Sequence, residues 1–105
     1  GRQVFAEPPF ETEMGGLAAG IPSTIAWTFL EQHLDAALAL PESVWQIGAM
    51  ALATGELGAR IAAGPSGAAG VGALVALTRL PGLAKLLDLR PNSQVGTLVT
   101  EARFY

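Results

Sequence analysis

The 105-residue sequence contains no cysteine. This absence excludes a disulfide framework, a zinc site built on thiolates and a cysteine nucleophile. The first fourteen residues also lack the apolar stretch and cleavage site of a secretory signal peptide. We therefore expect a cytoplasmic protein. The first residue is glycine rather than methionine, as we expect of a processed or excised chain.

Basic side chains are few and scattered. Six of them stand against nine carboxylates, which gives a formal net charge of −3. The basic residues are Arg2, Arg60, Arg79, Lys85, Arg90 and Arg103. Because they form no positive stripe that could neutralise a phosphate backbone, we expect no nucleic-acid partner.

Two runs without charge, residues 14–30 and 61–78, approach the length of a membrane span. The second run is built largely of glycine and alanine and contains Pro65, so it gains little by leaving water. The first contains GLAAG, a pair of small residues of the kind that brings membrane helices together. We interpret both runs as buried elements of a domain and predict no membrane role.

Hydrophobic periodicity predicts alternating helices and strands after an arm and turn over residues 1–16. The predicted helices cover residues 22–33, 42–55 and 66–80, and a short amphipathic turn covers 82–89. The predicted strands are the short apolar runs 35–40, 59–64 and 95–100. This alternation over residues 17–105 is typical of an α/β layer with parallel pairing, formed by a single segment, residues 1–105.

The stretch GPSGAAGVGALVAL, residues 64–77, is unusually rich in small residues for a helix. Gly67, Gly70 and Gly72 together cost a helix about 2 to 3 kcal/mol relative to alanine. Two explanations are open. Either the helix packs closely against a neighbour, or its N-terminus stays open to a ligand.

Known nucleotide patterns do not fit this stretch. GAAGVG has the wrong glycine order for a dinucleotide fingerprint, and no G-K-[ST] of a Walker loop occurs. GPSGA could be a nucleophile elbow around Ser66, but the only histidine, His33, precedes the serine. A complete hydrolase triad therefore cannot be assembled, and a small serine hydrolase is the weakest of the alternatives.

The order and spacing of four segments resemble those of a known enzyme family. The segments are MGGLAAGIPSTIAW (14–27), DAALALPESV (35–44), GPSGAAGVGALVAL (64–77) and LVTEARFY (98–105). Together they are similar to the C-terminal part of diaminopropionate ammonia-lyases, which are fold type II pyridoxal-phosphate enzymes. The resemblance implies part of a parallel-sheet, three-layer α/β large domain that flanks the cofactor ring.

The resemblance also implies roles for three residues. Thr100 matches a hydroxyl residue that lies near the pyridine nitrogen of pyridoxal phosphate. Ser66 and Gly67 match the segment packed beside the cofactor. Two positions depart from the family pattern: Gly64-Pro65 stands where an acid is common, and Ala102 replaces a glycine.

The family's Schiff-base lysine and its glycine-rich phosphate loop have no counterpart here. The single lysine, Lys85, lies among charged neighbours, and we interpret it as a surface residue. We therefore expect a C-terminal portion of an ammonia-lyase acting on a small amino acid such as 2,3-diaminopropionate, inactive without the remainder of the parent enzyme. A second copy of the chain, which would form a homodimer, is a further candidate partner. A non-catalytic interaction module, or a degenerate fragment whose apolar faces need a partner, is the main alternative.

Overall fold

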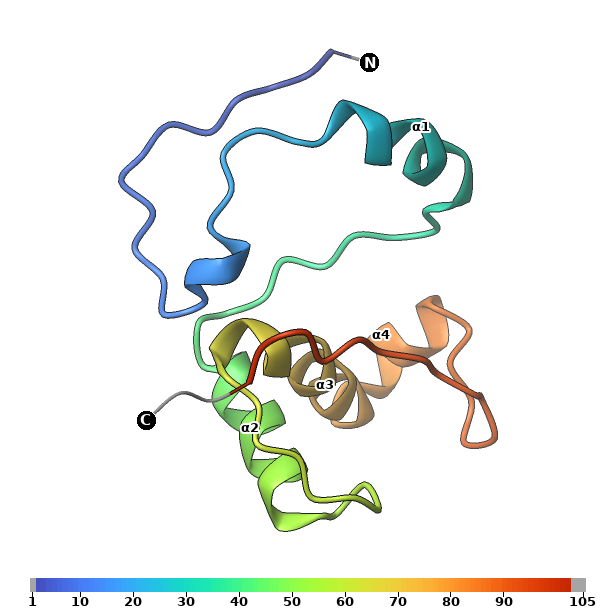
Figure 1. The fold of residues 1–105 in the computed structure, drawn as a ribbon. Helices are drawn as coiled ribbons and strands as arrows, with labels where there is room; N and C mark the ends of the chain where they lie inside the picture. Colours follow the sequence, from blue (N-terminus) through green and yellow to red (C-terminus); the bar gives the residue numbers. More distant parts are fainter. Residues whose placement is uncertain (1, 103–105) are drawn as a thin grey trace.

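The computed structural model describes residues 2–102. The helical elements are η1 (Gly15–Leu17), α1 (Thr24–His33), α2 (Val44–Thr54), α3 (Pro65–Thr78) and α4 (Pro81–Leu86). Residues 2–43, the N-terminal lobe, form the upper part of Figure 1, and residues 44–102, the C-terminal lobe, form the lower part. Residue 1 and residues 103–105, which end the last segment of the resemblance, lie outside the described range.

The helices predicted over residues 22–33, 42–55 and 66–80 are confirmed as α1, α2 and α3. The Ser23 hydroxyl caps α1 by accepting a hydrogen bond from the Ala26 N–H at 3.2 Å. Helix α2 ends at Gly55, which adopts a φ of 79° that glycine reaches without steric cost.

The predicted parallel sheet is wrong. Residues 35–40 and 95–100 are extended, but no strand ladder forms within residues 2–102, and the one β contact there is an isolated antiparallel bridge between Ala63 and Ala102. Two physical reasons account for the difference. Residues 35–40 are mostly alanine and leucine, and alanine favours strands poorly. In addition, α2 and α3 pack directly against each other and leave no layer between them for a sheet.

Two glycines bring the backbones of α2 and α3 into contact. A Cβ atom added to Gly72 would collide with the carbonyl oxygen of Val44, and one added to Gly48 would collide with the carbonyl oxygen of Ala68. A Cβ at Gly48 would also lie 2.6 Å from the Gly72 nitrogen. The helices can therefore cross at this distance only because both positions lack a side chain.

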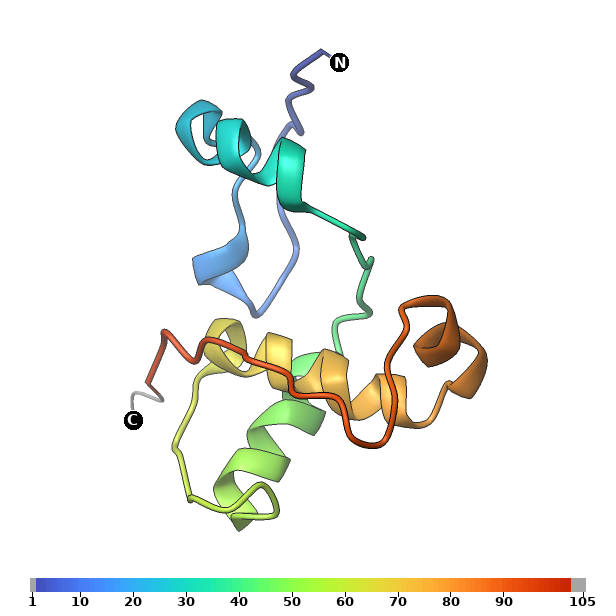
Figure 2. The same cartoon turned by 90° about the vertical axis from the view of Figure 1, so that its right-hand side faces the viewer.

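The last extended segment runs along α3 in both views (Figures 1 and 2). Val99 packs against the apolar core, and a Cβ at Gly70 would lie 2.6 Å from the Thr97 hydroxyl oxygen. The core itself is small. Its buried apolar residues are Val44, Ala51, Leu52, Ala63, Ala68, Ala69, Val71 and Leu77.

The N-terminal lobe has no core of its own. Within residues 2–43 no residue is buried, and α1 contacts none of the other described helices. Its attachment to the C-terminal lobe is polar: the Trp45 Nε1–H donates to Glu13 Oε2 at 2.9 Å, and the Gly16 N–H donates to Ser66 Oγ at 2.9 Å. None of the helices in residues 2–102 has the length and hydropathy that crossing a bilayer requires.

The contact between α2 and α3 predicts opposite effects for two glycine-to-alanine changes. Gly72→Ala should destabilise the chain by about 1 to 3 kcal/mol, because the new methyl group overpacks the helix crossing. Gly82→Ala on α4 is the matched control, since nothing lies within 4 Å of a Cβ there. This control should be neutral or gain up to about 1 kcal/mol from helix propensity. Urea unfolding followed by far-ultraviolet circular dichroism measures both, and a Gly72→Ala chain as stable as wild type would contradict the packing explanation.

Candidate functional site

The N-terminus of α3 meets the end of the last extended segment at Glu101. The Gly64 N–H donates to the Glu101 carbonyl oxygen at 3.0 Å, and the Ser66 N–H donates to the Glu101 carboxylate at 2.8 Å. A carboxylate is favourable here because the first amides of a helix lack partners and carry partial positive charge. Glu101 therefore binds the end of the chain to α3 through both its backbone and its side chain.

Gly67 packs against the backbone of Glu101. It is buried, and an added Cβ would lie 2.6 Å from the Glu101 carbonyl oxygen and 2.8 Å from the Glu101 nitrogen. The missing side chain at Gly67 thus lets the last segment cross α3 at backbone contact. At Gly67, as at Gly72, close packing explains the glycine.

Ser66 connects three parts of the chain. Its N–H bonds to Glu101, while its hydroxyl oxygen accepts a hydrogen bond from the Gly16 N–H in η1. The residue is half-buried. In the bond with Gly16 the Ser66 hydroxyl acts only as an acceptor, so its own proton can still be donated to a neighbouring group.

Thr100 precedes Glu101 in the extended segment and is exposed. No hydrogen bond of its hydroxyl group is found within the part of the chain that the structure describes. The three residues singled out from the resemblance thus have different surroundings. Gly67 and Ser66 contact Glu101 directly, whereas Thr100 is connected to them through its peptide bond to Glu101.

Sequence reasoning missed Glu101 and Gly16. Glu101 lies 35 residues from Ser66, and Gly16 lies 50 residues from it. Neither pairing produces a local pattern, because helix caps are normally found within a few positions of the helix start. One local signal was usable. The N-cap of α3 is Gly64, which has no side chain to accept a hydrogen bond from the first amides of the helix, so an acceptor must come from elsewhere in the chain.

Glu101 occupies the surroundings of two of the three residues that the resemblance singled out. Glu101 fills the space over Gly67 and takes the Ser66 N–H, so neither is open to a ring or to a phosphate. The Thr100 hydroxyl is exposed, and it can donate to or accept from a ring nitrogen. Of the three residues, only Thr100 thus has an exposed hydroxyl for a cofactor, and pyridoxal phosphate stays a prediction.

Other chemistry at this junction lacks the necessary groups. His33 lies on α1, which makes no contact with α3, so no histidine stands beside Ser66 as a hydrolase requires. Lys85 lies on α4 and is exposed, which confirms its interpretation as a surface residue. Among residues 2–102 no three His, Asp or Glu side chains are grouped closely enough to hold a metal ion.

Removing the charge of Glu101 should weaken the junction. Glu101→Gln keeps the shape of the side chain but loses its favourable interaction with the N-terminus of α3, and we expect about 0.3 to 1 kcal/mol less stability. Glu56→Gln, at an exposed position outside the junction, should leave stability unchanged. Urea unfolding of the two variants provides the measurement. Equal stability of both would show that the negative charge of Glu101 does not stabilise the N-terminus of α3.

Comparisons of the chain with protein-family models, with curated proteins and with solved structures found no match. The resemblance to ammonia-lyases therefore stays a prediction. The contacts around Glu101 are independent of it, because they follow from the coordinates of this chain alone.

Proposed function

We propose that this chain is the C-terminal portion of a pyridoxal-phosphate-dependent ammonia-lyase. The observation that supports this proposal is the contact of Ser66 and Gly67 with Glu101, the residue that follows the exposed Thr100 in the chain. Segments 64–67 and 98–101 are the two that the resemblance assigns to the cofactor. They are more than thirty residues apart in the sequence and are in contact in the structure through Glu101. The proposal concerns the function and does not include a parallel sheet.

Pyridoxal phosphate, when bound, draws electrons from the α-carbon of an amino acid and so makes loss of the α-proton and of the β-amino group feasible. In this proposal Thr100 holds one hydrogen bond at the pyridine nitrogen. Its hydroxyl is neutral and can serve as donor or acceptor, so it orients the ring without adding a charge. Ser66 borders the same edge, and Gly67 lets Glu101 fix the position of Thr100 by close backbone contact.

The remaining requirements come from partners. The Schiff-base lysine and the phosphate loop belong to the remainder of the parent enzyme, and the substrate is a small amino acid of the 2,3-diaminopropionate type. A cytoplasmic setting is part of the same proposal. So is the absence of a nucleic-acid partner, since the sequence has no basic stripe.

The isolated chain should be inactive. Mixed with pyridoxal phosphate, it should give no absorbance band of a lysine-bound cofactor and release no ammonia from 2,3-diaminopropionate, because its one lysine lies on α4, away from Thr100 and Ser66. Absorbance spectra and an ammonia assay test both points. A band that disappears in Lys85→Arg would contradict the assignment, since the chain would then carry its own Schiff-base lysine.

In the assembled enzyme, this chain together with the polypeptide that supplies the lysine and phosphate loop, Thr100→Val should shift the cofactor absorbance and lower the rate of ammonia release. We expect about a 10-fold to 100-fold loss, the effect of removing one hydrogen bond to the ring, worth about 1.4 to 2.7 kcal/mol. Thr100→Ser retains the hydroxyl and should stay close to wild type. Unchanged spectra and rates in Thr100→Val would remove Thr100 from the site.

A second candidate function is a non-catalytic interaction module. One observation favours it. Helix α1 carries large apolar side chains that no other described helix covers, among them Ile25 at 76% exposure and Phe29 at 69%. Apolar area of this kind on a folded chain marks an interaction surface.

A further inference from the structure

The chain exposes far more surface than a folded monomer of its mass. Its accessible area is 8239 Å² for 10.8 kDa, whereas a globular monomer of that mass exposes about 5,500 Å². The radius of gyration agrees: it is 14.9 Å, against about 13 Å for a compact chain of this length. The excess of about 2,700 Å² exceeds the roughly 1,000 to 2,500 Å² that each copy contributes to an obligate dimer.

Helix α1 carries part of this exposed surface. Ile25 and Phe29 are four residues apart and share one face of the helix. Trp27, Leu30 and Leu34 are also 45 to 49% exposed. An apolar surface that extends over more than one face of a helix is typical of a helix seated in a groove rather than one lying on a flat surface.

The C-terminal lobe contains an unfilled groove of suitable character. It has a volume of about 820 Å³ and lies between the C-terminal part of α3, α4 and residues 88–95. Leu74, Leu77, Leu89 and Val95 contribute its apolar lining. Grooves of this size are within the usual range for occupied binding sites.

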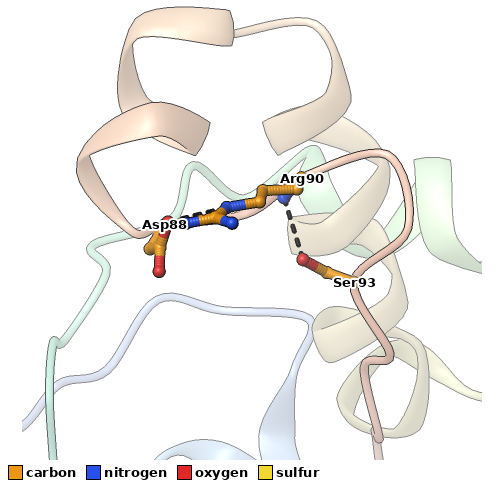
Figure 3. A network of polar contacts seen from close by, with 3 residues as sticks. All are labelled: Asp88, Arg90 and Ser93. Carbon is orange, nitrogen blue, oxygen red and sulfur yellow. Dashed lines mark hydrogen bonds and ion pairs between the residues drawn. The ribbon is translucent and has the colours of Figure 1, made fainter.

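The polar end of the groove is held in place. The guanidinium group of Arg90 bonds Asp88 Oδ1 at 3.0 and 3.1 Å, and the Arg90 N–H donates to Ser93 Oγ at 2.9 Å (Figure 3). Lys85 lines the same groove. These contacts link residues 88, 90 and 93 at the surface of the groove.

Charge distinguishes the two lobes. Residues 2–43 carry one basic and six acidic side chains, a net charge of −5, and residues 44–102 carry four basic and three acidic side chains, a net charge of +1. Helix α1 and its flank contribute Glu31 and Asp35, whereas the groove contributes Lys85 and Arg90 beside Asp88. Pairing two N-terminal lobes face to face would bring like charges together, but pairing an N-terminal lobe with a C-terminal lobe brings opposite charges together.

We propose that two copies of this chain form a dimer in which α1 of each copy occupies the groove between α3 and α4 of the other. The proposal rests on the second candidate function, the interaction module, and does not depend on the lyase. It fills the apolar groove with the apolar residues of α1 and sets Glu31 and Asp35 near Lys85 and Arg90. The exchange is reciprocal, so the assembly closes at two copies and leaves no helix or groove of this kind unoccupied.

Sedimentation equilibrium of the chain should give twice the mass of 10.8 kDa. Phe29→Glu changes α1, and Val95→Glu changes the groove; both residues are exposed, at 69% and 47%. Each variant alone should be largely monomeric. An equal mixture should recover part of the dimer, because the intact groove of the first accepts the intact helix of the second and restores one of the two contacts. Leu86→Glu on α4, 81% exposed and outside the groove lining, is the matched control and should stay dimeric.

Far-ultraviolet circular dichroism checks that each variant keeps its helices. If Phe29→Glu loses helical signal, Glu31→Lys tests the same contact through charge, and it should weaken the dimer.

The proposal is overturned if the wild-type chain is monomeric at micromolar concentration, or if the mixture of Phe29→Glu and Val95→Glu stays monomeric. If the wild-type chain is monomeric, the fluorescence of a dye that binds apolar surface distinguishes failure of the dimer from failure of the interaction module. Strong dye fluorescence that falls in Phe29→Glu leaves the interaction module standing with a different partner. Weak fluorescence that is equal in both removes the interaction module as well, while the lyase proposal still depends only on the ammonia assay.

Discussion

The contact between Gly48 and Gly72 is the constraint on which the rest of the structure depends. It allows α2 and α3 to cross at backbone distance, and the small core forms around that crossing from alanines, valines and two leucines. The gain comes from dense packing of short side chains, which repays the helix propensity that the glycines give up. Because both helices use these faces on each other, neither is free to cover a sheet.

Glycine also determines how the chain end is attached. At Gly67 the last segment reaches α3 so closely that Glu101 bonds the helix N-terminus with both its carbonyl oxygen and its carboxylate. Ser66 adds a contact to Gly16, so a single turn of α3 joins segments from the beginning, middle and end of the chain. This convergence is what makes the junction a candidate site.

The two proposals use different parts of the molecule and answer different questions. The lyase proposal concerns the junction at Glu101, where small residues and hydroxyl groups meet. The dimer proposal concerns the surface that the C-terminal lobe cannot cover, because a core of eight mostly small residues leaves the large apolar side chains of the N-terminal lobe in water. Polar bonds such as the one between Trp45 and Glu13 hold the lobes together without burying that surface.

The sequence by itself determined the helices. Periodic apolar residues, the Ser23 cap and the stop at Gly55 are local signals, and they placed α1, α2 and α3 within a few residues. It also showed that residues 64–77 need close packing or a ligand to offset their glycines. Only the tertiary structure decided that packing is the answer and that residues 35–40 and 95–100 form no sheet. The physical reason is range: a helix forms from contacts three and four residues apart, whereas a strand, the crossing at Gly72 and the cap by Glu101 each depend on a neighbour that local sequence does not specify.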